Sequence, residues 1–231
     1  MLACRQFSYD GSELLNEGVG YGVLGHPYGR RAFYADGASL FIRKELFEHL
    51  GGFDEHHFIF AEDADLCWRA WLVGSKVACV KDAIVYHEGG GTLQGGGGER
   101  EDYATSVFRR YQGERNTLRN LIKNYSLPVL AITLPVYLVI SLSECLLFIA
   151  LRRFDVAKGG YLKAWWHTFV NLGDTMKYRR VVQSKRRVSD WSILKQMEWR
   201  IGHVVGFLQI GVPRVISDMG IEVLSGKEDV D

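Results

Sequence analysis

The sequence has few cysteines and no CxxC pair among them. Its four thiols, at Cys4, Cys67, Cys79 and Cys145, also show no regular spacing. This excludes a disulfide framework and predicts free, mostly buried thiols in a reducing compartment. The opening residues, MLACRQFSYDGSELL, lack the basic start and the apolar run of a secretory signal.

A strong net charge is also missing. The 231 residues carry 28 Lys plus Arg against 27 Asp plus Glu, and 47% of them are hydrophobic. This composition is enough for one large domain or two small ones with a sizeable core. The charges are unevenly placed, because most acids lie in residues 1–102 and the stretch from Arg109 to Arg200 is basic. Such asymmetry indicates a negatively charged partner, either nucleic acid or a membrane surface.

The first half has the pattern of part of an α/β domain. Residues 1–36 have no sustained period and predict a loop with a short strand or helix, while the apolar run Gly37–Arg43 predicts a buried strand. A short helix is expected over residues 44–50, where two glycines end it, and a second helix from Asp63 to the glycine at position 74.

A strand and a glycine loop follow. Lys76–His87 alternates and is β-branched, which predicts one strand or two short ones. Seven glycines between residues 89 and 98 predict a flexible loop, since regular structure there would cost too much conformational entropy.

The second half contains an apolar run of membrane length. Leu127–Leu151 has one charge, Glu144, and as a helix it is long enough to cross a hydrocarbon layer of ~30 Å, with a kink expected at Pro135. A single span, a re-entrant hairpin with both ends in the cytoplasm and a buried core helix all remain open. Basic residues flank both ends, so the positive-inside rule gives no orientation. They are Arg115, Arg119 and Lys123 before the run and Arg152, Arg153, Lys158 and Lys163 after it.

Two later segments, YLKAWWHTFVNL and WSILKQMEWRIGHVVGFLQIGV, mix Trp with Lys and Arg. This mixture is typical of helices that lie in a membrane interface. The basic stretch Lys177–Arg187 fits anionic lipid, or simply solvent. Nucleic acid is the weaker alternative, because the aromatic residues sit beside the apolar run and not among the basic cluster. We therefore expect a membrane partner and no nucleic acid.

Acidic residues gather in the stretch Gly51–Trp71, GGFDEHHFIFAEDADLCWRAW. Glu62 and Asp63 lie where the second helix is expected to begin, and acids there usually cap free N–H groups. The same placement would fix a carboxylate at the mouth of a cleft, so both interpretations stay open. The pKa of Asp63 is open as well, since a neighbouring carboxylate raises it and a helix N-terminus lowers it. His87 is an ordinary polar residue or a weak candidate for a metal or phosphate contact.

The order of these elements resembles that of a known family. Gly37-Ala38 is followed by the basic pair RK, by GGFDE, by aromatic residues with EDADLCWR, and by a histidine before the glycines. Over residues 37–92 this order resembles the acceptor half of family 2 glycosyltransferases of the inverting GT-A type, above all the rhamnosyltransferase-like members that build bacterial surface polysaccharides. The resemblance implies a partial GT-A (Rossmann-like) α/β domain followed by a mostly α-helical membrane-associated region.

The resemblance also implies a role for each matched residue. Asp63 would be the general base that deprotonates the acceptor hydroxyl, which then attacks the anomeric carbon from the face opposite the nucleotide. His87 would join a divalent metal, Mn²⁺ or Mg²⁺, on the diphosphate of the leaving nucleotide. The glycine loop would close over donor and acceptor. Acceptor binding would fall to Glu62, Asp65, Arg69, Gly37 and Ala38, with a pairing of Asp65 and Arg69.

The donor half of such enzymes is missing from the sequence. No DxD metal motif precedes Gly37, and the DAD at residues 63–65 lies in the acceptor motif. We therefore expect residues 1–113 to form the acceptor-side half of a GT-A domain. Residues 114–231 would form a helical membrane-associated region with the apolar segment 127–151. The metal is expected to bind only when a donor half is present, in this or a separate chain.

The expected function is that of an inverting hexosyltransferase, or of its C-terminal portion. It would transfer a sugar from a nucleotide-sugar donor to a lipid-linked or polysaccharide acceptor in cell-surface glycan synthesis. The expected location is the cytoplasmic face of the cell membrane, because nucleotide sugars are cytosolic. The alternative is a non-catalytic fragment that anchors to the membrane or binds a partner.

Overall fold

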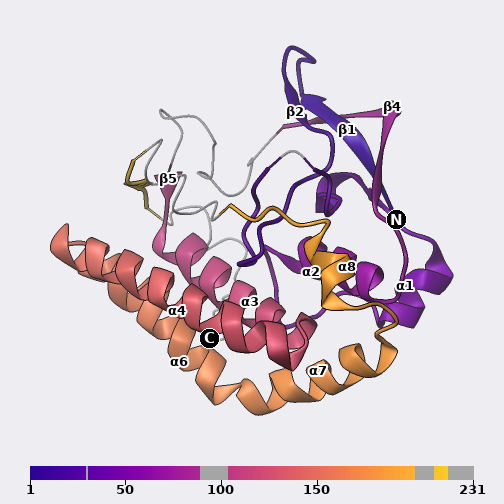
Figure 1. Cartoon of the computed structure of the whole chain (residues 1–231). Helices are drawn as coiled ribbons and strands as arrows, with labels where there is room; N and C mark the ends of the chain where they lie inside the picture. The colour runs from indigo at the N-terminus through magenta and orange to yellow at the C-terminus, as the bar shows by residue number, and fades with distance from the viewer. Residues whose placement is uncertain (30, 89–103, 201–210, 218–231) are drawn as a thin grey trace, which may run out of the picture.

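The computed structural model describes residues 1–29, 31–88, 104–200 and 211–217. They form a mixed structure of helices and strands (Figure 1). The predicted glycine loop at residues 89–98 lies outside the described residues, as does part of the last predicted interfacial segment.

A small sheet is built around β1 (Leu2–Ser8). Strand β4 (Ala78–His87) pairs with β1 in parallel, with a register shift after Val80, and this confirms one strand near residues 76–87. On the other side of β1, β3 (Leu40–Phe41) pairs antiparallel at one end and β2 (Leu14–Asn16) at the other. The first strand is thus a central element of a region for which the sequence predicted mainly loop.

Two predicted helices are confirmed and one predicted strand is wrong. Helix α1 (Lys44–Leu50) ends at Gly51, which has a left-handed φ of 85°, and helix α2 covers Glu62–Leu72. Gly37–Arg43 is not a buried strand, because Gly37–Ser39 forms a 3-10 turn, η1, and only two residues enter β3. The carboxylate of Asp36 bends the chain there by accepting the backbone N–H of Ala38 at 2.9 Å.

Helices make up most of the described chain after residue 103. The long helices α3 (Val107–Asn124) and α4 (Leu127–Ala150) are followed by α5 (Phe154–Val156), a π-helical segment η2 (Ala157–Leu162) and α6 (Lys163–Val170). Helices α7 (Leu172–Lys185) and α8 (Asp190–Leu194) then return toward α2. A parallel bridge pairs β5 (Ala104–Thr105) with β6 (Arg214–Val215).

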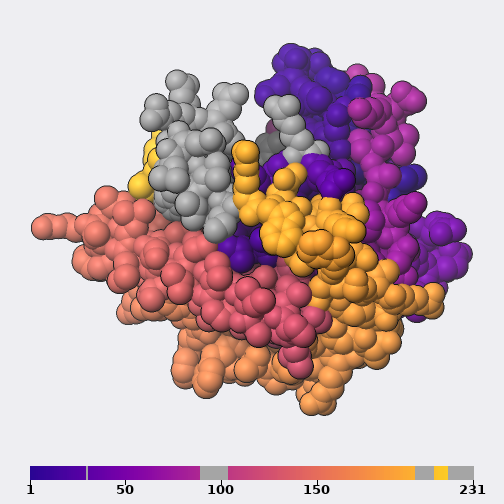
Figure 2. Space-filling model, in the orientation of Figure 1, coloured from indigo at the N-terminus to yellow at the C-terminus, as the bar shows by residue number. Residues whose placement is uncertain are grey.

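Helix α4 is one continuous helix, so the apolar run does not fold into a hairpin by itself. The following segment runs back beside it, since Tyr161 donates to Glu144 at 2.8 Å and Trp165 donates to Ser141 at 3.2 Å. In Figure 2, α4 and α6 form the lower left flank of the molecule, with β1, β2 and β4 at the upper right.

Helix α4 presents its polar side inward and its apolar side outward. Of the 18 residues in its most apolar stretch, only 33% are buried. Helix α4 is therefore not a buried core helix. Its buried residues are Thr133, Tyr137, Ser141, Glu144, Cys145 and Phe148. The exposed large apolar residues of the same helix are Leu127, Ile132, Val136, Leu138, Val139, Leu142, Leu146 and Ile149.

The main core joins the two halves of the chain. Trp68 of α2 lies edge-on to Tyr125 with ring centroids 4.6 Å apart, and both belong to a buried cluster that also contains Ala3 and Val182. The predicted boundary after residue 113 falls inside α3, so the two predicted regions share one core. The predicted burial of the thiols is confirmed for Cys4, Cys67 and Cys145, while Cys79 is half-buried.

Candidate functional site

The first turn of α2 holds the carboxylate of Asp63 against η1. Asp63 Oδ2 accepts the backbone N–H of Gly37 at 3.1 Å, and Oδ1 accepts the N–H of Ala64 at 2.6 Å. The side chain therefore satisfies a free N–H of its own helix, as the capping interpretation predicts, and also joins two segments 26 residues apart. Pairing of β3 with β1 and a 2.7 Å hydrogen bond from Gln6 to Ser39 fix η1 on the sheet.

The electrostatic environment of Asp63 makes it a good proton acceptor. Burial, followed by the negative charges of Glu62 and Asp36, raises the pKa of Asp63 to about 7, although its two N–H donors oppose the shift. Burial and the charge of Asp36 also raise the pKa of Glu62. Glu62 Oε2 is buried and has no hydrogen-bond partner in the described part of the chain. Burial, with a smaller contribution from the charge of Asp63, raises the pKa of the Tyr34 hydroxyl and of the Cys67 thiol, so both groups stay neutral.

The predicted site residues divide into two groups. Gly37 and Ala38 are exposed, and they lie with the partly exposed Glu62 and Asp63 around one surface site. Asp65 and Arg69 are buried and point elsewhere. Their predicted pairing is confirmed at 2.8 Å, and the other oxygen of Asp65 accepts from Asn124 at 2.9 Å. Asp65 has no exposed surface, whereas Arg69 is 6% exposed and lines a pocket together with Asp54 and Lys123.

His87 lies at the end of β4, beside Ser8 in the strand register. Ser8 is two residues beyond Gln6, which contacts η1, so His87 and η1 share one region of the sheet. Within the described ranges, no group of three or more His, Cys, Asp or Glu side chains is arranged to hold a metal ion. These residues alone do not build a metal site, and the predicted divalent metal stays a prediction.

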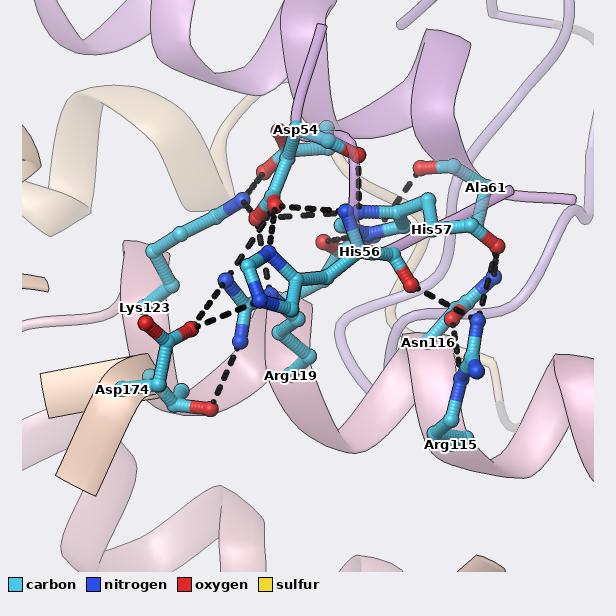
Figure 3. Close-up of polar contacts among 12 residues, drawn as sticks. Asp54, His56, His57, Ala61, Arg115, Asn116, Arg119, Lys123 and Asp174 are labelled. Carbon is cyan, nitrogen blue, oxygen red and sulfur yellow. Dashed lines mark hydrogen bonds and ion pairs between the residues drawn. The ribbon is translucent and has the colours of Figure 1, made fainter. Parts of the chain in front are cut away.

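Behind the site, a buried ion-pair network joins the GGFD turn to α3 and α7 (Figure 3). Asp54 Oδ2 lies 2.8 Å from Arg119 Nε and 2.5 Å from Lys123 Nζ. Lys123 also contacts Asp65, at 2.9 Å, and Arg119 contacts Asp174, at 3.1 Å. Burial alone would raise the pKa of Asp54, but Lys123 and Arg119 more than offset it and hold that pKa well below its usual range.

The role of α3 was missed at the sequence level. Arg115, Arg119 and Lys123 were expected to flank a membrane run, yet Arg119 and Lys123 are buried in the ion-pair network. A signal was present, because these three cations recur every four residues, and so do Asn116, Asn120 and Asn124. Residues four apart lie on one face of a helix, so the two polar stripes are adjacent, and in the structure they form a buried polar interface with the segment 54–61.

Comparison with known proteins gives the family. No curated protein and no solved structure gives a significant match. A family model described as glycosyl transferase family group 2 matches residues 8–170, which is more than half of the chain. The matched range includes η1, Asp63, α3 and all of α4. The chain therefore belongs to glycosyltransferase family group 2.

Proposed function

We propose that Asp63 is the general base of an inverting sugar transfer. The family implies a nucleotide-sugar donor and an acceptor. In the proposed reaction Asp63 takes the proton of an acceptor hydroxyl while that oxygen attacks the anomeric carbon of the sugar. The bond from this carbon to the nucleotide diphosphate breaks, the diphosphate leaves with the electron pair, and the configuration inverts. General-base catalysis of this kind contributes about 10²–10⁴-fold.

The single observation that supports the assignment is the environment of the Asp63 carboxylate. It is partly exposed, it is held by two backbone N–H groups, and its pKa is raised to about 7. A base of this pKa is substantially ionised at neutral pH and accepts a proton more readily than an ordinary aspartate. Glu62, Gly37 and Ala38 surround it and are proposed to contact the acceptor. Asp65 and Arg69 are proposed to hold α2 in place.

We further propose that the flank formed by α4 and α6 lies in a membrane. A 24-residue helix is about 36 Å long, enough to cross ~30 Å of hydrocarbon. Its outward side is apolar, and α6 adds Trp166 and Phe169, which are 67% and 69% exposed. Large exposed apolar surfaces of this kind mark interaction sites. A lipid-linked or polysaccharide acceptor in cell-surface glycan synthesis fits this arrangement, with the site on the cytoplasmic side where nucleotide sugars occur.

The test is sugar transfer by membranes from cells that express the full chain. Labelled nucleotide hexoses are supplied, and label is counted in lipid and polymer fractions. Asp63→Asn keeps the shape of the side chain but removes the base, so the rate should fall about 10²–10⁴-fold. Asp10→Asn, at an exposed turn, is the matched control and should leave the rate unchanged. If Asp63→Asn keeps the wild-type rate, Asp63 is not the base. A wild-type chain that binds membranes but neither binds nor transfers any sugar would favour the anchoring alternative.

A further inference from the structure

The segment that leads into the candidate base is a strained loop. Phe58, Phe60 and Ala61 have φ values of 61°, 68° and 63°, a left-handed conformation that residues with a Cβ rarely adopt. Ala61 is the N-cap of α2, and Asp63 follows two residues later. Strain of this kind persists only where the surrounding structure enforces it.

One buried amide of α3 holds most of this loop. Asn116 has no exposed surface, and its Nδ2 lies 3.0, 2.8 and 2.7 Å from the carbonyl oxygens of His57, Ile59 and Phe60. The two hydrogens of this amide nitrogen are thus shared among three carbonyl groups of the loop. The carbonyl of Phe60, one of the strained residues, accepts from this amide, so the amide is a contact that can hold the loop in its strained conformation.

Two neighbours on α3 complete the contact (Figure 3). Asn120, also fully buried, donates to the carbonyl of Ala61 at 3.0 Å, and its Oδ1 lies 2.8 Å from His57 Nε2. Arg115 donates to the carbonyls of His56 and His57 at 2.7 and 2.9 Å. Arg115 Nε also donates to Asn116 Oδ1 at 3.0 Å, which orients the amide with its nitrogen toward the loop.

We propose that Asn116, with Arg115 and Asn120, forms a positioning group that sets the location and the degree of burial of Asp63. The inference rests on the proposed role of Asp63 and adds three residues that touch neither substrate nor the reacting atoms. Without the α3 donors, Phe60 and Ala61 would relax toward ordinary φ values and turn the start of α2. Asp63 would then move away from Gly37 and meet more water.

The test follows the pH dependence of transfer by the full chain. Asn116→Ala should lower kcat about 10- to 100-fold, the cost of a misplaced catalytic group, with little change in the KM for the nucleotide sugar. The pH at half-maximal kcat should also move down, because better solvation lets the Asp63 pKa fall toward its ordinary value. Arg115→Ala removes three hydrogen bonds of a partly exposed residue, two to the loop and one to Asn116, but leaves the Asn116 and Asn120 donors in place. It should therefore shift the midpoint less, in the same direction.

Leu118→Ala is the matched control, because Leu118 is buried on the same helix and does not contact the loop through a hydrogen bond. It should lower the Tm but leave the pH midpoint of the folded enzyme unchanged. If the Asn116→Ala variant does not fold, the pH midpoint of the Arg115→Ala variant tests the positioning role. A wild-type midpoint in every variant that folds would overturn the positioning role.

The two proposals fail in different ways. If Asp63→Asn keeps full activity, the proposed base is wrong. If Asp63→Asn is inactive while Asn116→Ala and Arg115→Ala keep both the wild-type kcat and midpoint, only the positioning role is wrong. A second readout does not need transfer: the pH dependence of the Tm difference between wild type and Asp63→Asn reports the Asp63 pKa. When both proteins also carry Arg115→Ala, the pH dependence of the Tm difference between them should move to lower pH.

Discussion

At the scale of single residues, Lys123 shows how buried carboxylates are neutralised behind the site. Its side chain has no exposed surface, and its ammonium contacts both Asp54 and Asp65. Two aspartates from different segments are thus neutralised by cations of α3. Loss of one partner from such a network leaves a buried charge uncompensated, which is far more costly than loss of an exposed ion pair.

We therefore expect Lys123→Met to lower the free energy of unfolding by about 3–5 kcal/mol, measured by urea denaturation in detergent. Lys44→Met is the matched control. Lys44 lies 3.8 Å from Glu48 in a pair whose side chains are 83% and 62% exposed, so its loss should cost no more than about 0.5 kcal/mol. Equal costs for the two substitutions would contradict the buried network.

Asp63 could be chosen as the candidate base from the sequence, but its environment could not be predicted. The EDAD motif pointed to Asp63, and the capping and catalytic interpretations both apply to the geometry found. The contact with Gly37 depends on a 3-10 turn that the apolar run Gly37–Arg43 did not indicate. The partners of Asp54 lie 65 and 69 residues away, on a helix whose cations looked like membrane flanks.

At the scale of elements, glycine has opposite roles in two helices. Gly51 ends α1 with a left-handed φ of 85°, whereas Gly113 lies inside α3 without a positive φ. A Cβ at either position would meet no atom within 4 Å. Only the backbone conformation therefore distinguishes them.

Gly51→Ala should lower the free energy of unfolding by about 1 kcal/mol, because alanine is strained at positive φ. Gly113→Ala should raise it by about 0.5–1 kcal/mol, since alanine favours a helix interior. Thermal unfolding of each variant, compared with wild type, shows whether its free energy of unfolding falls or rises. A gain from Gly51→Ala would contradict the left-handed end of α1.

Elements were predictable where their signals are local. The glycines after α1 predicted the first helix, the helical spacing of apolar residues before Gly74 predicted α2, and length predicted α4. Strand β1 was largely missed because its longest partner is β4, with Leu2 beside Ala78. Its sequence, LACRQFS, has no clear alternation, and only pairing distant in sequence makes it a strand.

At the scale of the whole molecule, the outward apolar side of α4 is the feature that needs a partner. Tyr137, Ser141 and Glu144 of this helix contact α3 and η2, so the side left for solvent is mostly apolar. We expect this flank to hold the chain on a lipid bilayer.

The substitution Leu142→Lys tests whether α4 contacts the lipid bilayer. Leu142 is 48% exposed on α4, and a lysine at the centre of a membrane helix costs about 2.5–3.5 kcal/mol, which would lower partition into lipid vesicles about 100-fold. Leu15→Lys is the matched control, since Leu15 is 40% exposed on β2, and it should not affect partition. Vesicle flotation gives the bound fraction. Equal binding of both variants would place the membrane contact elsewhere.

The most direct test of Asp63 as a general base is the pH dependence of sugar transfer by the full chain. If Asp63 must be ionised, kcat should rise with pH and reach half its maximum near the pKa of about 7. Asp63→Asn should remove this rise together with most of the rate. An Asp63→Asn enzyme with the same rise, or a wild-type midpoint near the ordinary aspartate pKa of about 3.9, would contradict this role.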